Sequence, residues 1–225
     1  GGGSGFLFFN APPDRVRVSN SIFCGNSDAL DLYVDNGTLL SGDGNVGGGV
    51  FPPFDQPTDT NGTTPAQLNL AELGRYGGLT DTMPPLPNSP ALDRATGSTA
   101  TADQRGVIRP VDGNFDNTAT ADSGAAESFV VRITTGQDQL DTPAGAQVSL
   151  REALRDAPLG AVVTAPASLG ASPNLSRGEL VVAQPVILAA SSSSLRLTVS
   201  NGQTRAFHVL PGVCFHASRV DFQGR

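Results

Sequence analysis

Short stretches of alternating apolar and polar residues, separated by turn sequences, constrain the fold of this chain more than any other feature. Each stretch places Val, Leu, Ile or Phe at every second position, which is the period of a half-buried β-strand. Turn residues fall between the stretches, as in "DNG" at 35–37 and "SNG" at 200–202. The pattern predicts an all-β protein with strands at 16–23, 129–133, 179–188, 195–200, 206–210 and 219–223.

One stretch has the period of an α-helix, "QVSLREALRDA" at 147–157. Leu150, Ala153 and Leu154 fall on one of its faces, and we expect Glu152 and Arg155 to point outward. Because the helix is short, we expect it to cap or plug the strand-rich part of the chain.

The composition excludes several classes of function. All 14 basic residues are Arg, and with 21 acidic residues the net charge is −7. Such a chain has no basic surface for nucleic acid or anionic lipid. It also has no run of about 18 apolar residues, so we expect no insertion into a membrane.

Residues 50–127 differ from the rest, because they are rich in Pro, Thr, Asp and Gly and have little periodicity. Disorder is one interpretation, but the dispersed apolar and Arg residues favour an ordered wrapping. Within the stretch "DQRGVIRP", Asp103 with Arg105 or Arg109 could bind a ligand. We expect instead that Asp103 pairs with one of these Arg residues and orders the loop, since buried charges need partners.

Two segments resemble parts of known bacterial β-helix proteins. "SLREAL" at 149–154, with its flanking sequence, resembles the CSLREA domain, although Val148 stands where that family has its leading Cys. Residues 68–127 resemble the choice-of-anchor Q domain. Its most specific pieces are "GGLTDT" at 77–82, "NSPALD" at 88–93 and "DQRGVIRP" at 103–110.

The resemblance implies a right-handed parallel β-helix, a pectin-lyase-like solenoid, in a secreted or cell-surface bacterial protein. On this interpretation residues 1–49 form β-helix coils and residues 50–127 form the long irregular Q-like segment. Residues 128–225 form the CSLREA-like segment, with its one short helix, and start the next β-helix. Proteins of this family usually run from the CSLREA domain through the coils to the Q domain, whereas this chain starts in the coils and ends in the CSLREA-like segment, so it looks circularly permuted.

Joining the last residues to the first restores a continuous coil sequence. The alignment pairs Ala217, Ser218, Phe222 and Gly224 with Val18, Ser19, Phe23 and Gly25, a step of 26 residues through the join. This length suits one coil of a β-helix. The pattern therefore favours a structural protein, a repeat unit or subunit of a head-to-tail β-helical filament or surface layer, and the resemblance implies that it is extracellular. Its partners would be copies of itself.

The seam between copies is expected at the two ends of the sequence. We expect Ile22, Phe23, Val220 and Phe222 to stack inside it. The opening "GGGSG" then serves as the glycine turn of a coil, although it could also be a linker. The full set of predicted seam residues is Gly1, Gly2, Gly3, Phe6, Phe8, Ile22, Phe23, Val220, Phe222 and Gly224.

Two other functions remain open: a surface adhesin that binds glycans, and a polysaccharide lyase or hydrolase. The Asp residues are scattered in turns, where hydrogen bonding within the turn accounts for them, so we assign no catalytic residue and no cofactor. A structural calcium ion is the one metal considered. Its candidate ligands are Asp43, Asn45, Asp112, Asn114 and Asp116.

Overall fold

The chain folds into parallel β-solenoid coils, about eight turns in all, with strands at 32% of its residues, in a computed structural model. The structure describes residues 6–9, 15–26, 30–142, 145–166, 169, 173–191, 194–199 and 205–224. All pairings between its named strands are parallel, which confirms the predicted fold class. The chain divides into two compact units, Gly1–Leu70 with Pro84–Ser128, and Ala71–Met83 with Phe129–Arg225.

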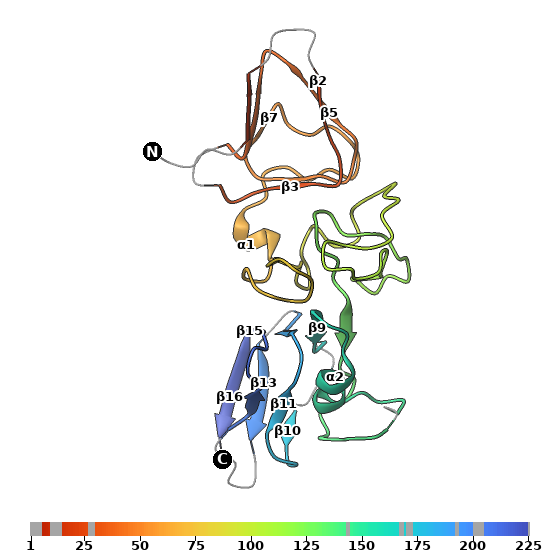
Figure 1. Cartoon of the computed structure of the whole chain (residues 1–225), viewed down its shortest axis with the longest axis vertical. Helices are drawn as coiled ribbons and strands as arrows, with labels where there is room; N and C mark the ends of the chain where they lie inside the picture. The colour runs from red at the N-terminus through yellow and green to blue at the C-terminus, as the bar shows by residue number, and fades with distance from the viewer. Residues whose placement is uncertain are drawn as a thin grey trace. The chain divides into compact units, whose positions relative to one another are not determined.

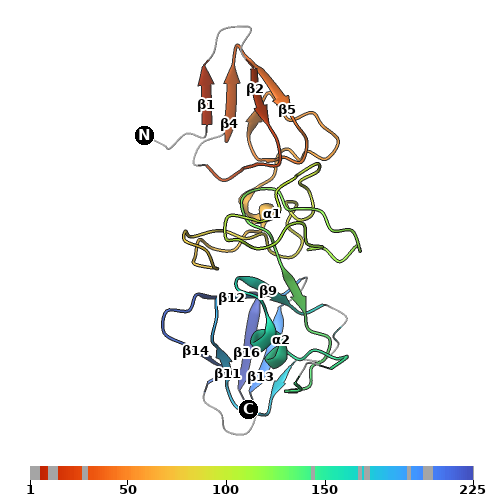
Figure 2. The same ribbon diagram turned by 45° about the vertical axis from the view of Figure 1, so that its right-hand side comes forward.

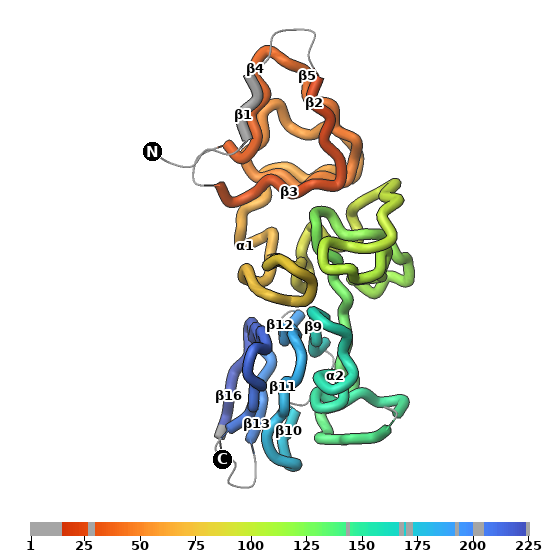
Figure 3. Tube along the Cα trace, viewed as in Figure 1, coloured from red at the N-terminus to blue at the C-terminus, as the bar shows by residue number. Residues whose placement is uncertain are grey.

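Three short parallel sheets build the solenoid of the first unit. Their strand orders are β1-β4-β7, β2-β5 and β3-β6, and Figure 1 shows them as the sides of a triangle. β1 and β4 lie side by side in Figure 2, and the windings can be followed along the tube in Figure 3. The strands are β1 (Phe6–Phe9), β2 (Arg15–Val18), β3 (Ile22–Phe23), β4 (Leu32–Asp35), β5 (Thr38–Ser41), β6 (Val46–Gly47) and β7 (Val50–Phe51).

The coils of this unit shorten and then close. Phe6 pairs with Leu32, 26 positions later, but Leu32 pairs with Val50, only 18 positions later. Buried Phe54 fills the interior at this narrow end and contacts the apolar side chains of the coils. The Asn61 side chain bonds both the N–H and the carbonyl of Phe54, at 3.1 and 2.9 Å. The interior is therefore sealed on this side.

Residues 84–128 fold against these coils. The Ser123 hydroxyl donates to the carbonyl of Gly44 at 2.6 Å, and the Gly124 N–H donates to the carbonyl of Asn20 at 2.9 Å. Isolated antiparallel bridges such as Ala95 with Ala121 take the place of regular strands. The four-residue helix α1 (Pro65–Leu68), which precedes this segment, was not predicted because it is too short to show a period.

The second unit also has three parallel sheets, with strand orders β8-β9-β12-β15, β10-β13-β16 and β11-β14. Their inner faces share one apolar core, which includes Leu180, Val186, Leu188 and Leu197. The elements are β8 (Val130–Arg132), α2 (Leu150–Asp156), β9 (Ala161–Thr164), β10 (Asn174–Leu175), β11 (Leu180–Val182), β12 (Val186–Ala189), β13 (Leu195–Val199), β14 (Phe207–Val209), β15 (Phe215–Ser218) and β16 (Val220–Gly224).

Helix α2 caps the start of this second solenoid. It packs on β11 and β9, and Leu150, Ala153 and Leu154 are buried in the core. The expectation that Glu152 points outward is wrong, because its side chain is fully buried. Burial works to raise the pKa of Glu152, but the N–H groups of Ser149 and Asp141, which donate to its carboxylate, hold that pKa below its usual value. No described helix is long and apolar enough to cross a membrane.

The cap of α2 gives a first testable prediction. The Ser149 hydroxyl accepts the N–H of Glu152, while Glu152 accepts the N–H of Ser149, which is a reciprocal capping box. We expect Ser149→Ala to lower the free energy of unfolding of the second unit by about 1 kcal/mol. Ser149→Thr keeps the hydroxyl and is the control. Equal urea midpoints for the alanine variant and the wild type would contradict this role.

Candidate functional site

The last coil of the second unit has open edges on all three faces. Among the described residues, β14 pairs only with β11, β15 only with β12, and β16 only with β13. The other edge of each strand presents backbone N–H and C=O groups that need hydrogen-bond partners. This coil is therefore a template for another strand layer.

Three phenylalanines lie at the interior positions of this open coil. Phe207, Phe215 and Phe222 are in register with Leu180, Val186 and Leu197 of the preceding coil, all of which are buried. The Phe207 ring lies 4.9 Å from that of Phe215 and 5.9 Å from that of Phe222, between centroids. The Phe222 side chain is nonetheless 55% exposed. The apolar interior thus reaches the end of the last coil without a cover.

The first coil of the first unit is open in the same way. Among the described residues, β1, β2 and β3 each pair on one side only, with β4, β5 and β6. Val16, Val18 and Phe23 are only partly buried, although they pack on the interior of the unit. Both end coils therefore combine free strand edges with incompletely covered apolar side chains.

The predicted seam residues occupy these coils, with one correction. Ile22 packs against Val46, Leu68 and Ala91 on the other side of β3 from Phe23, so the expectation that it lies in the coil interior is wrong. Adjacent residues of a strand point to opposite faces, which is the physical reason. Phe6, Phe8, Val220 and Gly224 lie in register with Leu32, Val34, Leu195 and Val199, and Gly1, Gly2 and Gly3 lie outside the described residues.

Other residues lie over part of the opposite end of each solenoid, although among the described residues β8 also pairs on one side only, with β9. Phe54 and Asn61 seal the first unit, and α2 covers the edge of β11 in the second. In addition, Arg151 of α2 donates to the carbonyls of Gly178 and Glu179, which directly precede β11, both at 2.8 Å. These contacts protect part of that end in each unit, next to Phe54 in the first and at β11 in the second.

A buried charge network holds residues 103–127 together. Arg105 lies 2.8 Å from Asp103, and their side chains are 1% and 0% exposed. Arg109 does not pair with Asp103 but lies 2.8 Å from Glu127, which is fully buried. The structure thus joins Asp103 to Arg105 as an ordering pair and supplies Glu127 as the partner of Arg109.

The carboxylates of this network are satisfied by the chain itself. Asp103 also accepts the N–H groups of Arg105, Val107 and Glu127, at 2.7–2.9 Å. Glu127 accepts the N–H groups of Val111 and Asp122, at 2.8 and 2.9 Å. Carboxylates that are 0% exposed and have this many donors within the chain are structural, because a substrate cannot reach them.

The same network makes stability depend on pH. Burial, followed by the charge of Glu127, raises the pKa of Asp122 to about 8, and burial raises that of Asp93 to about 6. Since both pKa values exceed those of an unfolded chain, the folded state holds these protons more tightly. Their stabilisation is complete below about pH 4 and is lost as the pH rises through these two values.

We therefore expect the melting temperature of the first unit to fall between pH 5 and pH 9. Carboxylates whose pKa is lowered, such as Asp138 and Glu152, are ionised throughout that window and add no slope. Asp122→Asn should flatten the dependence, as followed by thermal unfolding at a series of pH values. A melting temperature that rises toward pH 9 would contradict the shift.

Two of the five calcium candidates lie in the tight corner after β5. Asp43 accepts the N–H groups of Gly44 and Thr58, both at 3.0 Å. Asn45 is fully buried, and its side-chain amide donates to Asp59 at 3.1 Å. These side chains tie neighbouring coils together.

The other three candidates lie together in one exposed loop. Asp112 and Asp116 accept main-chain N–H groups two to five residues ahead, at 2.6–2.9 Å, and Asn114 bonds Asp116. The turn hydrogen bonds therefore occupy their oxygens. In the described part of the chain, no group of three or more His, Cys, Asp or Glu residues could hold a metal ion.

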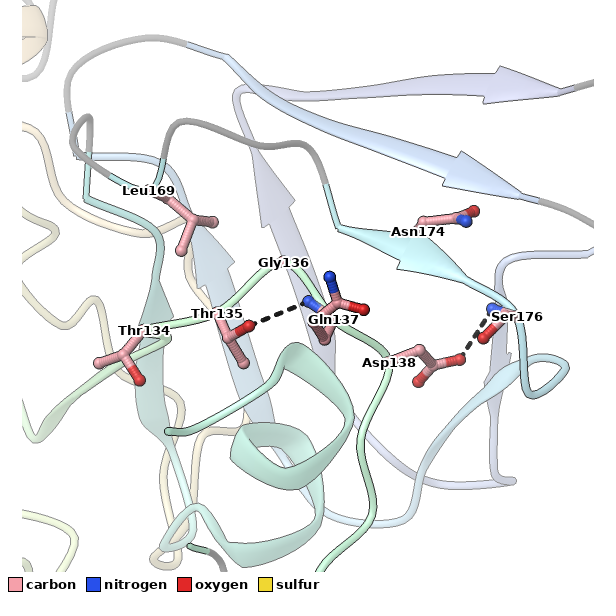
Figure 4. Close-up of a pocket in the computed structure, with 8 residues that line it drawn as sticks. All are labelled: Thr134, Thr135, Gly136, Gln137, Asp138, Leu169, Asn174 and Ser176. Atoms are coloured by element: carbon pink, nitrogen blue, oxygen red, sulfur yellow. Dashed lines mark hydrogen bonds between the residues drawn. The ribbon is translucent and has the colours of Figure 1, made fainter. Parts of the chain in front are cut away.

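A polar pocket of about 360 Å³ lies at the start of the second solenoid. Figure 4 shows the loop after β8 on one side of it, and Asn174 and Ser176, in and just after β10, on the other. Asp138 forms part of the wall, but its side chain is 1% exposed. The lining residues are Thr134, Thr135, Gly136, Gln137, Asp138, Leu169, Asn174 and Ser176.

The chemistry of this pocket suits binding better than proton transfer. Arg151 donates to both carboxylate oxygens of Asp138, at 2.7 and 3.0 Å, and the N–H groups of Ser176 and Arg177 donate to it as well. Burial works to raise the pKa of Asp138, but these donors hold that pKa below its usual value. The pocket's one acidic group, Asp138, is therefore an ionised carboxylate whose charge is balanced by Arg151 and whose oxygens already accept hydrogen bonds. Hydroxyl and amide groups are left to contact a ligand.

Comparison with protein-family models, curated proteins and solved structures gave no match. The CSLREA-like and Q-like interpretations therefore stay predictions. Because one fold carries many functions, the function has to be argued from the open coils, the charge network and the pocket.

Sequence reasoning did not find several of these features. It did not identify Glu127, which lies 18 positions from Arg109, or the pocket, whose two sides are more than 30 positions apart. It also did not single out Phe207 and Phe215 at the interior positions of the open coil. The alternation in "FHV" and "FHAS" was the available signal for these two, because Phe takes the inward position in each strand.

Proposed function

We propose that this chain is an extracellular structural protein, a unit that assembles head to tail into a β-solenoid filament or surface layer. The last coil of one copy pairs with the first coil of the next. The observation that carries the proposal is the pair of end coils, each of which combines strands paired on one side only with incompletely covered apolar side chains. The extracellular location rests on the resemblance to secreted bacterial β-helix proteins.

Backbone pairing supplies the driving force together with apolar burial. β14, β15 and β16 offer one free edge each, as do β1, β2 and β3, so three parallel sheets would continue across the junction. Covering the exposed half of Phe222 alone contributes about 1–2 kcal/mol, about half of the free energy of burying a whole Phe side chain. Main-chain hydrogen bonds would fix the direction of assembly.

A dilution series tests this function. In sedimentation velocity, the 225-residue protein is expected to sediment as species larger than its 23.0 kDa monomer, with a mass that rises with concentration. If the copies are repeats of one longer polypeptide, they would meet at the same junction. A single copy of 225 residues should therefore still associate with others. A monomer at every concentration would refute the proposal.

The polar pocket favours a second candidate function, the binding of a surface glycan. Its lining of hydroxyl and amide groups, with no uncompensated charge, suits the hydroxyl groups of a neutral sugar. Titration calorimetry with cellobiose and maltose is the test, with Gln137→Ala in the pocket and Gln56→Ala outside it as control. Binding of either sugar with about 1 mM affinity, weakened only by Gln137→Ala, would support this function. Absence of binding, or equal binding by both variants, would exclude it.

A further inference from the structure

The geometry points to one register for the junction: each residue of the last coil lies beside the residue 26 positions further on, counted through the end of one copy into the next. This inference rests on the proposed function and makes it more specific. The partner is a second copy of this chain, and the contacting strands are β14 with β1, β15 with β2, and β16 with β3.

The interior positions of the two coils coincide in this register. Phe215, Ala217 and Phe222 lie in register with buried interior residues of their own unit. A step of 26 places them beside Val16, Val18 and Phe23, which pack on the interior of the first unit. A step of 25 or 27 would set interior residues beside exterior ones, because successive strand residues point to opposite faces.

The third face agrees with the other two. The same step places Phe207 beside Phe8, which is in register with buried Val34. One interior position differs, since Val220 falls beside the polar residue Ser21. Five residues separate β14 from β15, and five separate β1 from β2, so the first two faces remain aligned around the coil.

The backbone conformation of one corner supports the same step independently. Arg219, between β15 and β16, has φ of 56°, and Asn20, between β2 and β3, has φ of 51°. Residues other than Gly seldom adopt this left-handed conformation. Within the first unit, Asn20 already stacks on left-handed Asp43 of the next coil through a 3.0 Å main-chain hydrogen bond. Arg219 lies 26 positions before Asn20 through the join, so the junction repeats an existing corner stack.

Disulfide formation between two chains tests the register. Position 216 falls beside position 17, and both face away from the interior, so His216→Cys in one chain and Arg17→Cys in the other should bond when the chains are mixed. Both chains carry Cys24→Ser and Cys214→Ser. Neighbouring strands hold such pairs at about 5 Å between Cα atoms, within reach of a disulfide. Arg15→Cys is the control, because a shift of two residues sets its Cα about 8 Å from that of position 216, beyond that reach.

The inference predicts a dimer band for the Arg17→Cys mixture under non-reducing conditions, at least about tenfold stronger than for the Arg15→Cys mixture. Sedimentation velocity of the reduced mixtures measures association without the disulfide, so it tests head-to-tail association separately from the register. Association without this selectivity would overturn the register and leave the head-to-tail function standing. Absence of association would overturn both.

Discussion

Phe222→Asp is expected to abolish association of this protein while the monomer stays folded. The aspartate would place a charge in the apolar interior of the junction, with no partner for it, at a cost of several kcal/mol. Together with the lost burial of the phenyl ring, this weakens association more than about 100-fold, since each 1.4 kcal/mol is a factor of ten. Sedimentation velocity should show a 23.0 kDa monomer, and circular dichroism should show the wild-type β spectrum.

Val181→Asp is the matched control for this variant. Val181 is 49% exposed, close to the 55% of Phe222, but it lies on β11, which is already paired with β14. The same change of chemistry at that position should leave assembly intact. Undiminished association of Phe222→Asp would show that β16 is not part of the junction.

Glu127→Ala is expected to lower the free energy of unfolding of the first unit by about 3–5 kcal/mol, the usual cost of breaking a buried ion pair. The variant leaves Arg109, only 8% exposed, without its carboxylate partner. It also removes the acceptor for the N–H groups of Val111 and Asp122. Urea unfolding, followed by circular dichroism, measures the loss.

An exposed ion pair supplies the comparison. Arg75 and Asp81 lie 3.3 Å apart with side chains 74% and 48% exposed. Asp81→Ala should therefore change stability by less than about 1 kcal/mol. The double variant Arg109→Met/Glu127→Leu should recover part of the loss, because it leaves no unpaired charge. A loss below about 1 kcal/mol for Glu127→Ala would show that the network does not hold this segment.

The fold class was predictable because apolar and polar residues alternate within individual strands. "LRLTV" at 195–199 alternates buried and exposed residues over its first three positions, as the sequence indicates. "AVVT" at 161–164 is buried at all four positions, so it has no period and its assignment to a strand needs the tertiary structure. Residues 16–23 read as one strand, but the left-handed backbone of Asn20 divides them into β2 and β3.

The candidate sites were predictable only where the partners are close in sequence. Asp103 and Arg105 are two positions apart, so their pairing could be proposed from the loop sequence alone. The outward expectation for Glu152 failed because helical periodicity does not register a capping box, in which a charged side chain turns back to the helix start. The pocket depends on an irregular loop meeting β10, and no pattern in the sequence encodes that meeting.

Negative-stain electron microscopy of the concentrated wild-type protein tests head-to-tail assembly most directly, because it shows whether the end coils of different copies join into filaments. The account predicts unbranched filaments of uniform width that shorten on dilution and are absent from Phe222→Asp at the same concentration. Isolated particles of monomer size at every concentration, or filaments that persist in Phe222→Asp, would contradict it.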